Sequence, residues 1–335
     1  MRARSFLILG AVTLLVGGAA VIAVVGDDRP QSAVQAAGPV LPGLRDRLAD
    51  VADVVVRDAA QTVTIRRTAD GWGVAELGNY PVPPEKVREI VRALVQLEKA
   101  EVKTSRADQW SRLSVEDVET AGATSKLVSL RNAAGEVVAQ LLIGKSGSGV
   151  GAEGSTYVRV PGEPQAWLAR GTLTANTKPG DWVDRRLFAI PTGDIQQVRI
   201  VHPDKSTVTL IREGDGPNFR LAELPAGGKA KLKRPDELDE IVQALNDMPS
   251  EDLAPLAERQ FPPSKTIRVT ITRTDGSIVA FDVADEGGER WLRFLDGRMP
   301  AGLPAAATTM AFQVPAWKLT PLERKLAELI EKPAG

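Results

Sequence analysis

The residues best suited to active-site chemistry lie together in the stretch GDWVDRRLFAIP, residues 180–191. The stretch contains two carboxylates, two guanidiniums and an indole: Asp181, Trp182, Asp184, Arg185 and Arg186. A hydrolase built on Asp181 and Asp184 could use the two carboxylates as general acid and base. Neighbouring guanidiniums lower the pKa of a carboxyl group, however, and a general acid needs the opposite shift. We therefore interpret the five residues as a clasp between two parts of the chain, with the hydrolase as an alternative. Asp181 and Arg185 are four positions apart and would form an ion pair on a short helix.

A second candidate for chemistry is Gly144-Lys145-Ser146, which resembles the end of a phosphate-binding loop. That motif requires a glycine at position 139, where this chain has Ala139, and a helix after the loop. Here the flanking residues have the pattern of strands on both sides. We therefore predict no nucleotide site and no cofactor, and interpret the stretch as a long glycine-rich hairpin loop. The contact surface that such a loop could offer would include Gly147, Gly149 and Gly151.

The chain contains one histidine, His202, and no cysteine. These counts exclude thiolate chemistry and cysteine-ligated zinc, and they argue against a Ser-His-Asp triad or a histidine-rich metal site. We therefore predict neither catalytic nor metal-binding residues. His202 follows a strand-like run and precedes Pro203, so its side chain is predicted to be exposed at a turn.

The net charge of the 335-residue chain is −1. Nucleic-acid binding needs a basic face that neutralises phosphates, so the charge argues against a nucleic-acid partner. Hydrophobic residues make up 43% of the chain and charged residues 25%, as is typical of a protein that folds around a core.

The N-terminus has the pattern of a membrane anchor. Residues 5–26 carry no charge and follow Arg2 and Arg4. About 20 apolar residues in a helix span a bilayer core of roughly 30 Å, whereas the apolar region of a cleavable signal peptide is about 7–15 residues long. We predict an uncleaved transmembrane anchor at residues 1–27 with a cytoplasmic N-terminus, followed by a tether at residues 28–50.

Five pairs of similar segments occur in the same order along the chain. The pairs are QTVTIRR (61–67) with STVTLIR (206–212), WGVAEL (72–77) with FRLAEL (219–224), EIVRAL (89–94) with EIVQAL (240–245), LVSLRNAAGEVVAQLLI (127–143) with IRVTITRTDGSIVAFDV (267–283), and QAWLAR (165–170) with ERWLRF (289–294). Ordered self-similarity of this kind indicates a duplicated fold. We predict two equivalent units, residues 51–179 and 193–335, joined by a connector at residues 180–192. The last pair would make Trp167 and Trp291 equivalent core residues.

Each unit has the pattern of antiparallel β-meanders with one packed helix. Runs of β-branched residues alternate at period two and are separated by turn residues. Between the meanders of the first unit, Val87, Ile90 and Leu94 fall on one helical face. The sequence therefore predicts an α+β fold of two tandem duplicated units. A capping box formed by Thr320 and Glu323 predicts a C-terminal amphipathic helix.

The tryptophans allow two interpretations. Most of them occupy strand positions that would face a core, but Trp72 and Trp167 could also serve as platforms for sugars. A cell-wall or surface-glycan binding module that uses these indoles and the glycine-rich loop is therefore an alternative to a protein-binding role.

Three segments carry a further signal: GWGVAELGNYPVPPEKVREIVRALVQL (71–97), STYVRVPGEPQAWLARGTL (155–173) and GDWVDRRLFAIPTGDIQQVRI (180–200). In these segments the chain resembles the domain of unknown function 4340 family of bacterial envelope proteins, whereas LSVEDVETAGA (113–123) departs from the family's pattern. The resemblance implies no catalytic residues. It does imply a single-pass protein of the bacterial inner membrane with a periplasmic body, and a partner among ABC transporter subunits or other envelope proteins. The expectation is therefore a membrane-anchored accessory or binding protein without catalysis.

Overall fold

The computed structural model describes residues 38–147, 154–214, 216–224, 231–234 and 236–331. The predicted anchor at residues 1–27 lies outside these ranges, as do Gly149 and Gly151. Within the described ranges, no helix has both the length and the apolar character needed to cross a membrane.

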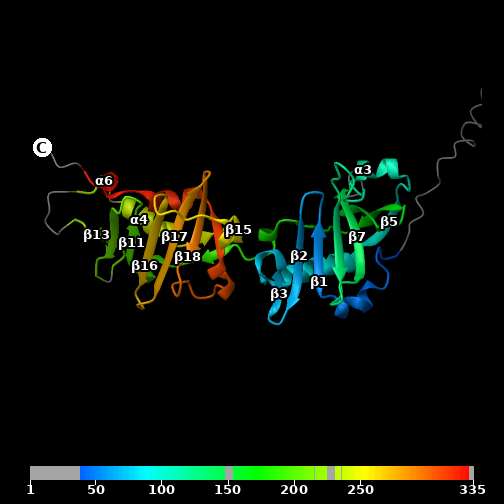
Figure 1. Cartoon of the computed structure of the whole chain (residues 1–335), viewed down its shortest axis with the longest axis horizontal. Helices are drawn as coiled ribbons and strands as arrows, with labels where there is room; N and C mark the ends of the chain where they lie inside the picture. Colours follow the sequence, from blue (N-terminus) through cyan, green and yellow to red (C-terminus); the bar gives the residue numbers. More distant parts are fainter. Residues whose placement is uncertain (1–37, 148–153, 215, 225–230, 235, 332–335) are drawn as a thin grey trace, which may run out of the picture.

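Two antiparallel sheets form two lobes that follow one another along the longest axis of the molecule (Figure 1). The sheet of the first lobe has nine strands in the order β4-β3-β2-β1-β6-β7-β8-β9-β5. These strands are β1 (Asp53–Arg57), β2 (Thr62–Thr68), β3 (Gly71–Val74), β4 (Tyr80–Val82), β5 (Glu98–Val102), β6 (Lys126–Arg131), β7 (Val137–Ser146), β8 (Ser155–Arg159) and β9 (Ala166–Arg170).

The sheet of the second lobe has eight strands in the order β13-β12-β11-β16-β17-β18-β19-β15. They are β11 (Ile195–Val201), β12 (Thr207–Arg212), β13 (Phe219–Leu221), β15 (Asp252–Pro255), β16 (Thr266–Arg273), β17 (Ile278–Glu286), β18 (Glu289–Phe294) and β19 (Met310–Val314). A separate two-stranded ribbon pairs β10 (Arg186–Phe188) with β14 (Met248–Pro249). The two large sheets therefore do not merge.

Each lobe packs one longer helix against its sheet, which makes the fold α+β. Helix α2 (Pro84–Gln96) begins with a proline, as predicted, and buries Val87, Ile90 and Leu94. Helix α4 (Glu237–Ala244) buries Leu238 and Ile241 in the second lobe. The remaining helical segments are short: η1 (Leu44–Asp50), η2 (Ala75–Leu77), η3 (Ala107–Gln109), α3 (Trp110–Leu113), η4 (Pro179–Asp181), η5 (Thr192–Asp194), η6 (Leu256–Glu258), η7 (Ala305–Thr309), α5 (Ala316–Leu319), η8 (Thr320–Glu323) and α6 (Leu326–Leu329).

The order of strands is the same in both sheets once β4 is set aside. In this order β8 of the first sheet corresponds to β18 of the second, and β9 corresponds to β19. Trp167 lies in β9, whereas Trp291 lies in β18. The predicted equivalence of these two tryptophans is therefore wrong, because the short match between QAWLAR and ERWLRF joined strands from different places in the sheets.

The predicted C-terminal amphipathic helix is also wrong. The chain forms α5, η8 and α6 instead, with extended backbone at Arg324 and Lys325. Leu319, Leu322 and Leu329 are nevertheless buried. Tertiary contacts override helix propensity here, because Lys325 pairs with Asp204 and the chain must bend to bury its leucines.

Candidate functional site

The connector holds its apolar residues in the core and its charged residues outside. Trp182 is only 4% exposed, and Leu187 and Phe188 are buried. The Trp182 indole Nε1–H donates to the Asn176 carbonyl oxygen at 3.0 Å. Arg185 forms the predicted ion pair with Asp181, although the backbone there is a 3-10 turn followed by a loop.

The connector is bound to the second lobe by backbone contacts. Strand β10 pairs with β14, and the Ser250 N–H donates to the Arg185 carbonyl oxygen at 2.6 Å. Gly180 lies against β15: a Cβ at this position would stand 2.4 Å from Oδ1 of Asp252. A side chain at position 180 would therefore displace the Asp252 carboxylate.

Helix α2 of the first lobe binds the connector through one lysine. Lys86 Nζ donates to the carbonyl oxygens of Asp181 and Val183 at 2.6 and 2.8 Å. Burial lowers the pKa of Lys86, and the nearby Arg185 guanidinium lowers it further. The five predicted clasp residues therefore lie in a segment that contacts both lobes, and Lys86 is a member of the clasp that the sequence did not indicate.

Aromatic side chains continue this contact through the core. Phe188 of the connector packs on Phe281 and Phe294, with ring centroids 5.7 and 6.2 Å apart. Tyr80 of the first lobe packs edge-on against Phe312 of the second at 6.3 Å. Most buried hydrophobic residues of the two lobes accordingly form one continuous cluster, and two smaller clusters of the described residues lie apart from it.

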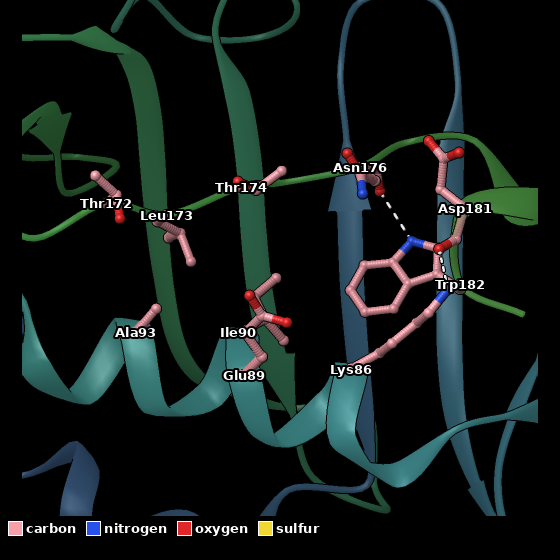
Figure 2. A pocket seen from close by; sticks show the side chains of 10 residues that line it. All are labelled: Lys86, Glu89, Ile90, Ala93, Thr172, Leu173, Thr174, Asn176, Asp181 and Trp182. Carbon is pink, nitrogen blue, oxygen red and sulfur yellow. Dashed lines mark hydrogen bonds between the residues drawn. The ribbon is translucent and has the colours of Figure 1, made fainter. Parts of the chain in front are cut away.

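A cavity of about 270 Å³ lies between α2 and the extended segment 172–176 (Figure 2). Figure 2 shows the Trp182 indole at one end, hydrogen-bonded to Asn176, with Lys86 reaching Asp181 from the helix. Glu89, Thr172 and Thr174 add polar groups to the lining. The cavity is therefore closed on one side by the clasp itself.

A larger cavity, about 390 Å³, opens between the two lobes. We call it the interlobe groove and define it by Asp70, Trp72, Tyr80, Asp184, Arg186 and Pro304. The first three belong to the first lobe, Asp184 and Arg186 to the connector, and Pro304 to the second lobe. Trp72 is half-buried and has the Arg67 guanidinium 5.1 Å from its ring centroid.

The groove contains polar groups with few protein partners. Tyr80 is 3% exposed, and within the described ranges its hydroxyl makes no hydrogen bond. Burial, and then the charge of Asp184, raise the pKa of Tyr80 to about 12, so the hydroxyl remains a proton donor at neutral pH. Asp184 accepts the Arg186 backbone N–H at 3.0 Å and is otherwise exposed.

Asp181 and Asp184 line different cavities. Asp181 borders the cavity beside α2, whereas Asp184 borders the interlobe groove. The hydrolase alternative needs both carboxylates in one site, and the structure does not bring them together in either cavity. No group of three or more His, Cys, Asp or Glu side chains that could hold a metal ion occurs in the described part of the chain.

The other candidate surface residues are also separated. Trp72 is in β3 and Trp167 in β9, with five strands between them, which is roughly 30 Å at the usual strand spacing. Lys99 Nζ lies 4.7 Å from the Trp167 ring centroid. Of the three named loop glycines only Gly147 is described, and its N–H donates to the Ser155 carbonyl oxygen at 2.9 Å.

Gly144 of the apparent phosphate-binding motif has a packing role. It lies within β7, and a Cβ there would stand 2.1 Å from the Leu113 carbonyl oxygen. The glycine allows the loop after α3 to cross the strand closely.

His202 is buried, 3% exposed, so the prediction of an exposed side chain is wrong. The C-terminal segment covers it: the ring lies beside the backbone of Arg324, and Lys325 pairs with Asp204 at 2.5 Å. Burial lowers the pKa of His202. The contact joins residues more than 100 positions apart, which is why the local pattern at the turn did not indicate it.

The fold and the clasp define a class of two-lobed α+β protein in which antiparallel sheets of the same strand order share a groove. The chain belongs to the family described as Domain of unknown function (DUF4340), whose model matches residues 72–266. The match contains α2, the whole connector and α4. No curated protein and no solved structure matches the chain significantly.

Proposed function

We propose that the protein is a binding protein without catalysis, anchored in the bacterial inner membrane, that holds a partner protein in its interlobe groove. The observation that carries the proposal is the groove, which is bordered by both lobes and by the connector. It offers an aromatic surface at Trp72 and the hydroxyl of Tyr80, which lines the groove and makes no hydrogen bond to the described residues. Surfaces of this kind are typical of binding sites, because a few polar groups that converge in a largely apolar cavity can orient a ligand.

We further infer that the two lobes arose by duplication. Their shared strand order supports this. So does a pair of matching contacts: Arg67 stacks on Trp72 at 5.1 Å and Arg212 stacks on Phe219 at 4.7 Å. Arg67 and Arg212 end the first pair of similar segments, and Trp72 and Phe219 begin the second. The connector would then be the joint that fixes the two copies relative to each other.

The location and partner follow from the N-terminal sequence and the family resemblance. Residues 1–27 would anchor the chain, and the basic residues before the apolar run would keep the N-terminus in the cytoplasm and the body in the periplasm. The proposed partner is a subunit of an ABC transport system or another envelope protein. A role without catalysis is supported by the separation of Asp181 and Asp184 into different cavities.

Site-specific photocrosslinking in membranes tests the proposal. A photoreactive amino acid would replace Trp72 or Pro304 in the groove and, as a control, the exposed Val137 on a hairpin of the first lobe. We expect one defined adduct from both groove positions, with an integral membrane subunit of a transport system identified by mass spectrometry. Equal yields from position 137, or no adduct from the groove, would contradict the proposal.

A glycan-binding module is the second candidate function. The observation that favours it is the half-buried Trp72 ring beside the Asp184 carboxylate and the Tyr80 hydroxyl in one cavity. An indole can cover the apolar face of a sugar while such polar groups bind its hydroxyls. Retention of the full-length protein on purified peptidoglycan should then be lost in Trp72→Ala at unchanged melting temperature. Trp317→Ala, at a tryptophan that is 69% exposed outside the groove, should retain it.

A further inference from the structure

The outer face of the second sheet carries a rigid cluster of two arginines around one carboxylate. Asp282 of β17 is 1% exposed and lies opposite Arg268 of β16 and Arg293 of β18. Arg268 donates to it through Nε at 2.7 Å and Nη2 at 3.1 Å. Arg293 donates through Nε at 3.2 Å and Nη2 at 2.9 Å. Both guanidiniums are therefore fixed by the carboxylate, while each keeps its Nη1 group free of these bonds.

A third arginine extends this cluster across the sheet. Val201 of β11 pairs with Arg268, and Arg199, two residues earlier on the same strand, pairs with Thr270. Arg199 is therefore on the same face as Arg268 and diagonal to it. Arg199 is exposed and forms no ion pair within the described ranges. We call Arg199, Arg268 and Arg293 the arginine row; it crosses four neighbouring strands, roughly 14 Å at the usual spacing.

The fold does not require charges at this place. At the corresponding place in the first sheet, Leu127 of β6 pairs with Leu142 of β7, and Leu142 pairs with Arg159 of β8. Arg159 is 1% exposed and covered by Trp110, 3.7 Å from its ring centroid. Apolar side chains fill this position as well as a buried ion cluster does, and often at lower energetic cost. The second sheet therefore carries three arginines around a buried carboxylate, with the Phe261 ring 4.6 Å from Arg293, where the first sheet carries two leucines and one covered arginine.

The charge of the row is only partly balanced. The single negative charge of Asp282 balances one of the three guanidiniums. Asp282 also raises the pKa of Arg268 and is the only charged group among the described residues that affects this pKa. The other carboxylates on this side of the sheet lie away from the row: Glu286 and Glu289 pair with each other four residues along β17 and β18 from Asp282 and Arg293. Glu223 accepts the Thr209 N–H at 3.0 Å and forms no ion pair with Arg199. Prearranged guanidiniums with free N–H groups are well suited to phosphate oxygens.

We propose that the arginine row binds an extended phosphate-bearing polymer. The row is too long for one phosphate group, so successive phosphates of a chain can occupy it. A bilayer surface fits less well, because membrane contact by a protein face needs apolar side chains that insert. The side chains beside the row are Thr266, Thr270 and Thr272. The large apolar side chains there that reach the surface are Ile278 and the half-buried Phe261, whose ring already packs on Arg293. This inference is independent of the function proposed for the interlobe groove.

Binding of fluorescently labelled long-chain inorganic polyphosphate to the full-length protein in neutral detergent tests the inference. Arg199→Gln is the decisive variant, because Arg199 is exposed and unpaired within the described ranges, so its loss should leave the fold intact. We expect roughly five- to tenfold weaker binding, with the slope of log affinity against log salt smaller by about one. The matched control is Arg131→Gln, an exposed arginine at the end of β6 in the first sheet, which should bind like the unaltered protein.

Competitors identify the chemistry of the ligand. Inorganic phosphate should displace polyphosphate no better than another salt of the same ionic strength does. Displacement by dilute phosphatidylglycerol micelles would overturn the proposal in favour of a lipid surface, and displacement by dilute phosphate would do so in favour of a single-anion site. Equal affinities of Arg199→Gln and Arg131→Gln for polyphosphate would also overturn it.

Discussion

Lys86 offers the most direct test of how the two lobes are held together. Its ammonium group donates to the carbonyl oxygens of Asp181 and Val183 at 2.6 and 2.8 Å. Lys86→Met keeps the apolar stem against the helix but removes both donors. A hydrogen bond from a charged group contributes about 1.5–3 kcal/mol, and the lysine is partly open to solvent, so we expect a total loss of about 2–4 kcal/mol in the free energy of unfolding.

Urea unfolding followed by tryptophan fluorescence measures this change, because the buried Trp182 lies beside the two carbonyl groups. Hydrogen exchange of the connector amides should become faster in the same variant, since the connector loses its contact with α2. The matched control is Lys178→Met in the same segment: Lys178 is exposed, and its side chain forms no hydrogen bond or ion pair within the described ranges. A change below about 0.5 kcal/mol in Lys86→Met, or an equal change in the control, would refute the reasoning.

Two further predictions concern glycine packing and pH. Gly144→Ala should lower the melting temperature more than Gly180→Ala, because the new Cβ meets the Leu113 backbone oxygen in the first case and the movable end of Asp252 in the second. Overpacking against backbone costs about 1–3 kcal/mol of the free energy of unfolding. The control Gly193→Ala should be nearly neutral, because nothing in the described ranges lies within 4 Å of the new Cβ. Equal melting temperatures of the Gly144 and Gly180 variants would contradict the prediction. Burial lowers the pKa of His202 below 6.5, so its contribution to stability is complete above that pH and is lost as the pH falls towards the folded-state pKa. Urea unfolding between pH 7.5 and 5.5 should show this loss, and hydrogen exchange of residues 324–331 should become faster over the same range. His202→Gln should reduce both effects. If the variant loses as much stability between these pH values as the unaltered protein does, the role of His202 is disproved.

The elements that depend on short-range pattern were predictable from the sequence. Val87, Ile90 and Leu94 repeat at helical spacing after a proline, and they are the buried face of α2. The alternation in QTVTIRR likewise gave β2, with Val63 and Ile65 buried. The ion pair between Asp181 and Arg185 was also predictable, because two residues four positions apart are close in any compact turn.

The features that depend on long-range contact were not predictable. His202 looked exposed from its turn, but a segment more than 100 residues later covers it. The C-terminal capping box was a valid local signal, yet the pairing of Lys325 with Asp204 and the burial of Leu329 broke the helix. The arginine row consists of residues from three strands whose register no local pattern sets.

The sequence by itself determined helix α2, strands such as β2, the ordered pairs of similar segments and the apolar N-terminal run, because each of these is recorded in the spacing of neighbouring residues. Only the tertiary structure decided that Tyr80 and Asp184 share a groove, that Asp181 and Asp184 face different cavities, and that Lys86 holds the connector. The physical reason is that these contacts depend on how two separate sheets pack through one continuous core. The orientation of that packing is set by many weak contacts at once, and no single segment of the chain carries it.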